Sequence, residues 1–257
     1  VRVASLKDQV HAGYVKTDIA GMSPKEQLKE ISAQTHELVR SQYSTLNRSL
    51  LPALEKVGLH LVMEHEKLNE EQQNVVSKIT MEYDAGERKT YLIKGVTGSG
   101  KTEVYMELIA HVLAQGKQAI VLIPEIALTY QTVRRFYNRF GAQVSIINSK
   151  LSAGERYDQF ERAKNGEISV MIGPRSALFT PFPALGIIII DEEHEASYKS
   201  ETVPRYHARE TAIQRAKMTD AVVVLGSATP SLESYYKAEN DEYCLLELKH
   251  RVQKRPM

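Results

Sequence analysis

The stretch GVTGSGKTEVY, residues 95–105, decides the fold class of this chain. It matches the pattern G-x-x-x-x-G-K-[S/T], with Gly95, Gly100, Lys101 and Thr102 in the required places. The apolar run TYLIK precedes it, and the helical pattern TEVYMELIAHVLAQG follows it. Glycines in such a turn let successive backbone amides face inward and form an anion nest, to which the following helix adds its positive end. The sequence therefore predicts a phosphate-binding loop between a strand and a helix.

The chemistry of this loop predicts a nucleotide triphosphate with magnesium. We expect the Lys101 ammonium to neutralise the β- and γ-phosphates of ATP, and the Thr102 hydroxyl to bind Mg²⁺. The predicted nucleotide-contacting residues of this stretch are Gly95, Thr97, Gly98, Ser99, Gly100, Lys101, Thr102 and Glu103.

A second acidic stretch, LGIIIIDEEHEASY at residues 185–198, completes the predicted site. Its four consecutive isoleucines are typical of a strand that is buried on both faces. Asp191 follows at the carboxyl end, the edge where ligands bind in open α/β sheets. We expect Asp191 to hold Mg²⁺ through water and Glu192 to polarise the attacking water.

The pattern between residues 68 and 257 predicts an α/β domain with a mostly parallel sheet. A helix is expected from Asn69 through Ile79, and short apolar runs then alternate with helical stretches. The runs expected as strands are TYLIKG, QAIVLIP, QVSIIN, ISVMIG, LGIIIID and AVVVLGSA.

Residues 1 to about 64 predict helices without a catalytic constellation. Ser23, Pro24 and Glu26 give a helix start signal, and apolar residues at three- and four-residue spacing follow it. A second short helix around residues 52–56 is expected to end near Gly58.

Composition narrows the class of protein. The 257 residues carry a net charge of +1, so any nucleic-acid surface must be a local patch. The single cysteine, Cys244, excludes an internal disulfide framework or a Cys-rich zinc site and favours a reducing, cytoplasmic setting. We find no membrane span or signal peptide in the sequence. Both ends, starting at Val1 and stopping after HRVQKRPM, indicate a piece of a longer protein.

The acidic stretch resembles the DEAH-like form of superfamily 2 helicases and translocases, in the order Asp191, Glu192, Glu193, His194. His194 would then couple the state of the phosphate to other motifs. GSATPS, residues 226–231, resembles the Ser-Ala-Thr motif that links hydrolysis to strand movement, which implies coupling roles for Ser227, Ala228 and Thr229.

Three further stretches are predicted to contact DNA. IPEIALT (residues 123–129) and GPRSALF (residues 173–179) each follow a strand and resemble the nucleic-acid contact motifs of that superfamily. SYKSETVPRYHARETA (residues 197–212) interleaves aromatic and cationic side chains, which suits stacking and backbone contact on single strands. The expected DNA-contacting residues are Thr129, Arg175, Ser176, Tyr198, Lys199, Arg205, Tyr206, His207 and Arg209.

From about Leu68 onward, these strings together resemble the first motor lobe of the PriA family of replication-restart helicases. The resemblance implies a RecA-like domain, ATP-driven 3′→5′ unwinding of forked or single-stranded DNA, and work with primosome proteins and single-strand-binding protein. It also implies nucleotide contact by Gln72 and a DNA-sensing role for the loop between Tyr198 and Arg209. Asn148 departs from the pattern, because the family usually has His there.

Residues 1–66 instead resemble the helical N-terminal domain of polyphosphate kinase, on VRVASLKDQV, SPKEQLKEI and RSQYSTLNRSLLPALEKVGLHLV. The front would thus be a helical segment fused, naturally or by artefact, to a RecA-like domain at residues 67–257. Two alternatives stay open: another superfamily 2 DNA translocase, and a non-catalytic helical assembly module of the polyphosphate kinase type.

Overall fold

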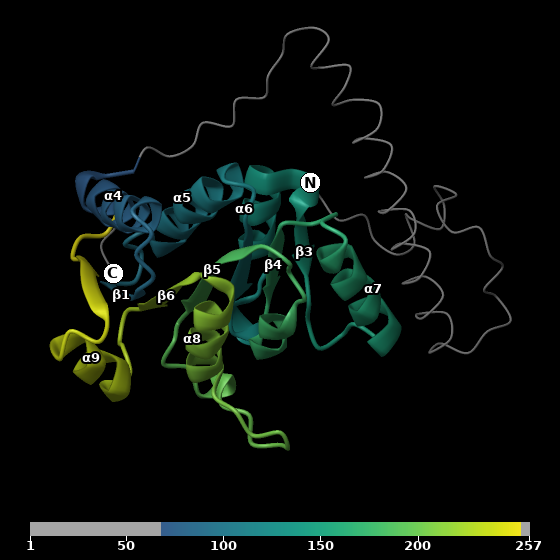
Figure 1. The fold of residues 1–257 in the computed structure, drawn as a ribbon. Coiled ribbons are helices and arrows are strands. Elements are labelled where there is room, and N and C mark those ends of the chain that lie inside the picture. Colours follow the sequence, from purple (N-terminus) through teal and green to yellow (C-terminus); the bar gives the residue numbers. More distant parts are fainter. Residues whose placement is uncertain (1–67, 253–257) are drawn as a thin grey trace, which may run out of the picture. The chain divides into compact units, whose positions relative to one another are not determined.

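The computed structural model describes residues 68–252, so the helices expected before Leu68 lie outside the described residues. Within this range a seven-stranded sheet has the order β3-β4-β2-β5-β6-β1-β7, and each neighbouring pair is parallel. The strands are β1 (Thr90–Gly95), β2 (Gln118–Leu122), β3 (Val144–Ile146), β4 (Val170–Gly173), β5 (Leu185–Asp191), β6 (Val222–Ser227) and β7 (Cys244–Leu248). The predicted parallel α/β fold is confirmed (Figure 1).

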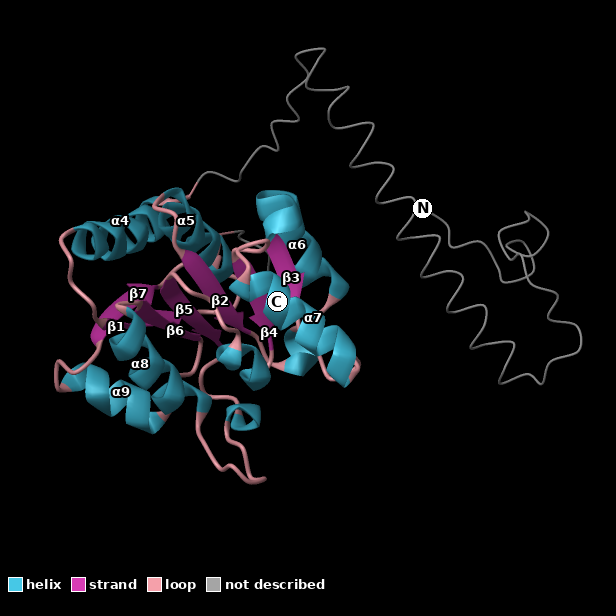
Figure 2. Cartoon of the chain, turned by 45° about the vertical axis from the view of Figure 1, so that its right-hand side comes forward, coloured by secondary structure: helices cyan, strands magenta, loops and turns pink. Residues whose placement is uncertain are grey.

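Helices cover both faces of this sheet (Figure 2). The α-helices are α4 (Glu70–Asp84), α5 (Lys101–Ala114), α6 (Tyr130–Phe140), α7 (Ala153–Lys164), α8 (Ala208–Thr219) and α9 (Leu232–Glu239). Four 3₁₀ turns follow strands or helices: η2 (Glu125–Ala127), η3 (Gly141–Gln143), η4 (Arg175–Phe179) and η5 (Ala196–Tyr198). Short connections between the parallel strands and the helices that join them are typical of this architecture.

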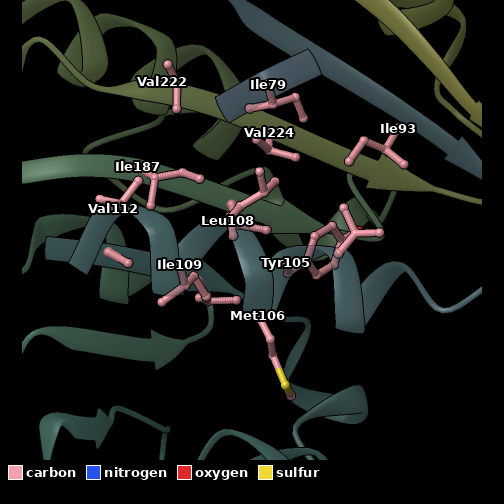
Figure 3. Packing of buried hydrophobic residues seen from close by; sticks show 14 of the residues in the cluster. Ile79, Ile93, Tyr105, Met106, Leu108, Ile109, Val112, Ile187, Val222 and Val224 are labelled. Carbon is pink, nitrogen blue, oxygen red and sulfur yellow. The ribbon is translucent and has the colours of Figure 1, made fainter. Parts of the chain in front are cut away.

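Two hydrophobic clusters, one on each face of the sheet, form the core. On one face α4, α5 and α6 pack against the sheet, and Figure 3 shows Tyr105, Leu108 and Val112 of α5 among side chains of the central strands. On the other face the contacts come from α7, α8 and α9, and the buried apolar residues of α8 are the small alanines Ala208, Ala212 and Ala216, with Ile213 partly buried beside them. These small side chains let α8 lie close to β5 and β6.

The central strands are buried on both faces, as the continuous apolar runs predicted. The four isoleucines of β5, residues 187–190, are at most 1% exposed. Six of the seven strands coincide with runs identified in the sequence, to within a few residues at their ends. The seventh, β7, was missed because its CLLEL segment is only partly buried and lies at the edge of the sheet, beside β1.

Candidate nucleotide site and its DNA-facing loop

The predicted phosphate loop connects β1 to α5 as expected. Gly98 and Gly100 have φ values of +81° and +79°, a conformation that side-chain-bearing residues rarely adopt. A Cβ at position 100 would overlap the Gln72 amide, so the second glycine also allows a close approach. The turn ends where α5 begins at Lys101, so the helix amino terminus is directed at the loop.

Lys101 joins the loop to the acidic stretch. Its ammonium is nearly buried, with 9% of the side chain exposed, and it donates to the Gly95 carbonyl at 2.9 Å. The same Nζ lies 3.8 Å from Glu192 Oε1, across the strand β6 that separates β1 from β5. The loop and the acidic motif therefore face one common space at the carboxyl edge of the sheet.

This space suits a phosphate chain. Ser99 Oγ is buried and has no hydrogen-bond partner among the described residues, which leaves a donor for an anion. Gln72 Nε2 donates to the Ser99 carbonyl at 2.9 Å. Its Oε1 accepts from Asn69 N, within a capping box that fixes the start of α4 and aims the amide at the loop. The residues present thus fit a nucleotide triphosphate.

Two tyrosines hold Asp191, the predicted magnesium ligand, one at its carboxylate and one at its backbone. Tyr105 of α5 donates to Asp191 Oδ1 at 3.0 Å, and Tyr198 of η5 donates to the Asp191 carbonyl at 2.7 Å. Burial, with the charge of Glu192, raises the pKa of Asp191, although the Tyr105 hydrogen bond acts in the opposite direction. Bringing a cation to this carboxylate would stabilise its ionised form. Sequence reasoning missed Tyr105, but its position four residues after Lys101 puts both on one face of α5.

The predicted coupling motif lies beside the acidic stretch. His194 Nδ1 and Ser227 Oγ are 2.8 Å apart and share a hydrogen bond, and Ser227 Oγ also accepts from Thr229 N at 2.9 Å. Glu193 N donates to the Gly226 carbonyl at 3.0 Å. The end of β5 and the end of β6 are therefore tied by both backbone and side chains, with Ala228 in the turn between Ser227 and Thr229.

The loop after η5 forms a hairpin that projects beyond α8 (Figure 1). An antiparallel bridge between Lys199 and His207 closes it, and Ser200 N donates to the Tyr206 carbonyl at 2.8 Å. Residues 201–205 are exposed. A groove of about 520 Å³ runs along the hairpin and is lined by Lys199, Ser200, Glu201, Arg205, Tyr206 and His207.

The remaining predicted DNA residues divide between surface and interior. Lys199 and Arg205 are exposed, Tyr206 and His207 are half-buried, and Tyr206 packs edge-on against exposed Phe179 at 5.3 Å between ring centroids. Thr129 caps α6, and Ser176 is half-buried in η4. Their contact with DNA stays a prediction.

Three expected contact residues are engaged within the protein instead. Tyr198 is buried against Asp191, and Arg209 is buried in an ion pair with Glu193 at 3.1 Å, so neither presents its side chain to DNA in this structure. Arg175 donates to the carbonyls of Ser197 and Lys199 at 2.8 and 2.9 Å, and these two hydrogen bonds hold the backbone at the base of the hairpin.

Two predicted nucleotide residues also lie apart from the loop interior. The Glu103 carboxylate pairs with Arg135 of α6, and the Thr97 side chain is on the exposed side of the turn. Asn148 shapes a turn after β3, because its Oδ1 accepts from Lys150 N at 3.0 Å.

Residues 65–232 match the family model described as "Type III restriction enzyme, res subunit", which is more than half of the chain. The chain belongs to this family. Residues 1–62 match the model of the polyphosphate kinase N-terminal domain.

Curated relatives of this family member include replication restart proteins PriA. The chain is 55% identical to PriA of Bacillus subtilis over 190 residues, which is 74% of the chain and 24% of that protein. It is 43% identical to PriA of Chlamydia trachomatis over 236 residues, 90% of the chain and 31% of that protein. The resemblance to the first motor lobe of PriA is confirmed, and the chain spans about a quarter to a third of these relatives.

Solved structures agree on the fold. RecG bound to a three-way DNA junction superposes with a TM-score of 0.54 at 22% identity, over 75% of the chain and 25% of RecG. A hypothetical ATP-dependent RNA helicase from Sulfolobus tokodaii gives a TM-score of 0.50 at 19% identity, over 72% of the chain and 54% of that chain. The predicted RecA-like architecture is thus confirmed. Among residues 68–252, none of the helices combines the length and apolarity needed to span a membrane.

Proposed function

We propose that the chain is the first motor lobe of an ATP-dependent DNA helicase that acts in replication restart. The observation that carries this proposal is the 3.8 Å approach of Lys101 Nζ to Glu192 Oε1, which places the phosphate loop and the acidic motif around one site. A triphosphate and Mg²⁺ bound there would supply the phosphoryl-transfer chemistry.

Each side chain of the site has a role that follows from its position. Lys101 and the loop amides bind and orient the phosphates, and Gln72 fixes the loop from the α4 side. Thr102 and Asp191 would hold the metal, with Tyr105 keeping the Asp191 carboxylate in place. Glu192, directly after β5, would take the proton of the attacking water.

His194 extends the site toward the coupling motif. Its hydrogen bond to Ser227 Oγ connects the acidic motif to the end of β6. We expect this contact to change when the phosphate state changes, because His194 Nδ1 is also only 3.8 Å from Glu192 Oε2.

Forked or single-stranded DNA is the proposed polymer substrate, contacted through the hairpin and the motif at Thr129. The similarity to PriA proteins supports this substrate, a cytoplasmic location, and partnership with primosome proteins and single-strand-binding protein. Since a superfamily 2 motor completes its ATP site with arginines from a second lobe, we expect this lobe to bind ATP but hydrolyse it slowly.

The decisive experiment compares nucleotide binding by the chain and by Lys101→Ala, using a fluorescent ATP analogue with Mg²⁺. Loss of the buried ammonium should weaken binding by about tenfold or more, on the order of 1.4 kcal/mol. Lys164→Ala is a matched control, since that lysine lies on the exposed end of α7, and it should bind as the unmodified chain does. Equal affinity of Lys101→Ala and the unmodified chain would refute the proposal.

A second candidate is a translocase of the restriction type, which the family model itself favours by its description. A preference for forked DNA over plain duplex supports replication restart. Equal binding to both DNAs supports the translocase.

For the front of the chain, we propose a helical assembly segment at residues 1–66 joined to the RecA-like domain at residues 67–257. The polyphosphate kinase match supports this division. The chlamydial alignment, which covers 90% of the chain, nevertheless extends in front of Leu68. Sizing the chain with and without residues 1–66 tests an assembly role, and sequencing the gene across the junction tests the fusion.

A further inference from the structure

A buried polar cluster lies next to the nucleotide site and is formed by Glu193, Arg209, Ser231 and Ser234. Glu193 is 1% exposed and Arg209 is 6% exposed. Arg209 Nη1 donates to Glu193 Oε2 at 3.1 Å, to Ser231 Oγ at 2.7 Å and to Ser234 Oγ at 2.8 Å. Glu193 Oε1 accepts from Ser231 N at 2.7 Å, and Oε2 accepts from Ser234 Oγ at 2.8 Å.

The cluster connects three segments that are far apart in sequence. Glu193 belongs to the acidic motif, Arg209 starts α8 directly after the hairpin, and the two serines start α9 after the Ser-Ala-Thr motif. Glu193 also acts on the α9 terminus itself, because Ser231 is the N-cap whose backbone amide it binds. A displacement of any one segment therefore disturbs the other two.

The other end of the hairpin is attached to the same motif. Tyr198 holds the Asp191 carbonyl, and Arg175 holds the backbone at Ser197 and Lys199. Both ends of the hairpin thus terminate on residues 191–193, while its tip at residues 201–205 is exposed. A ligand that moves the tip can therefore move the Mg²⁺-binding motif through these two attachments.

A buried ion pair suits a positioning role better than a stabilising one. Its desolvation offsets much of its attraction, so it adds little net stability, but breaking it by removing one partner leaves an uncompensated buried charge. Glu193 has its oxygens fully engaged, and this fixes the geometry of the pair.

We propose that the Glu193–Arg209 pair is the positioning link through which DNA on the hairpin changes the affinity of the nucleotide site. This inference rests on the proposed ATP- and DNA-binding function and names the residues that couple the two sites. Coupling of this kind is reciprocal: DNA changes the nucleotide Kd by the same factor by which nucleotide changes the DNA Kd.

The test measures that factor for the full chain. Kd for a fluorescent ATP analogue with Mg²⁺ is determined with and without a saturating single-stranded oligonucleotide, and the DNA Kd with and without nucleotide. We expect a factor of about 5 to 150 in the unmodified chain, in the range of typical couplings. Arg209→Met should bring both ratios close to one, while the nucleotide Kd without DNA changes by less than about threefold, or roughly 0.7 kcal/mol.

Two further variants separate coupling from folding. Arg209→Lys places three N–H donors on one nitrogen, which matches the three acceptors of Nη1, and should restore part of the factor. The double variant Glu193→Gln with Arg209→Met removes both charges, so it should fold even where Arg209→Met does not, and it should still lack coupling.

The outcomes are distinct. A double variant with the unmodified coupling factor overturns the proposed link, as does an unmodified chain that binds ATP but shows no effect of DNA. An unmodified chain that binds no nucleotide overturns the proposed function itself, and the link with it.

Discussion

Replacing Gly226 with alanine tests the packing that holds the acidic motif in place. Gly226 lies near the end of β6, and Tyr105 from α5 crosses over it to reach Asp191. A Cβ at position 226 would overlap Tyr105 Oη and lie 2.8 Å from Tyr105 Cζ. Because Tyr105 is fully buried, its ring cannot swing into solvent to make room.

Overpacking of this kind destabilises a core by about 1–3 kcal/mol. For a domain of this size, a loss of about 2 kcal/mol lowers Tm by about 4–8 °C. Thermal unfolding followed by circular dichroism measures this shift, and nucleotide binding measures whether displaced Tyr105 takes the Asp191 carboxylate with it. We expect both the Tm and the affinity for the ATP analogue with Mg²⁺ to fall.

The control is Gly154→Ala in α7, where an added Cβ meets nothing within 4 Å. A helical Gly-to-Ala change there should leave Tm unchanged or raise it slightly, by up to about 1 kcal/mol of stability. In the double variant Gly226→Ala with Tyr105→Phe, removal of the overlapping hydroxyl should make the combined loss smaller than the sum. A Gly226→Ala protein with the unmodified Tm and affinity would refute the described placement of Tyr105.

Three further predictions concern the surroundings of the site. Ser227→Ala leaves His194 and the Thr229 amide without their shared partner. It should lower the free energy of unfolding, measured in urea, by about 0.5–1.5 kcal/mol, and no loss of stability would contradict these hydrogen bonds. Phe136 is fully buried, so Phe136→Ala opens a cavity under α6 and should lower the free energy of unfolding by about 3–5 kcal/mol. Tyr137 is exposed, so Tyr137→Ala should change that free energy by no more than about 0.5 kcal/mol. Similar losses in the two variants would argue against the orientation of α6. Burial, and secondarily the charge of Arg209, lowers the pKa of His207, whose Nδ1 accepts from Arg209 N at the start of α8. The folded state therefore favours the neutral ring, and the stability that His207 contributes is complete above about pH 6.5 and lost as the pH falls below that value. His207→Asn keeps a capping acceptor that does not titrate, so its unfolding midpoint should fall less between about pH 7 and about pH 5 than that of the unmodified chain; equal slopes would exclude His207 as the cause.

Local chemistry explains which parts of the site the sequence could predict. The phosphate loop depends on glycine conformations and on Lys101 at a helix start, and both properties can be read within about ten residues. Asp191 could be predicted equally well, because four consecutive isoleucines are typical of a buried strand and the first polar residue after them is expected at its end.

The interior roles could not be predicted in the same way. Tyr198 and Arg209 were expected on a DNA surface because aromatic and cationic residues alternate in their segment. Their burial depends on what faces them, and Glu193, Ser231 and Asp191 come to these positions only through the sheet order. A sequence pattern gives the chemical type of a side chain, while its partner is set by the tertiary fold.

The sheet order also explains why the coupling groups collect where they do. Because β6 lies between β1 and β5, its last residues are the only backbone that separates the phosphate loop from the acidic motif within the described sheet. Tyr105 has to cross this backbone to reach Asp191, which requires Gly226, and Ser227 follows within reach of His194. We therefore expect a change in the distance between the phosphate loop and the acidic motif to be accompanied by movement at the end of β6. From there the Ser-Ala-Thr turn leads directly to Ser231 and the buried Glu193–Arg209 pair. Residues 226–231 therefore form a second route from the phosphate loop to the hairpin, beside the direct hydrogen bond of Tyr198 to the Asp191 carbonyl.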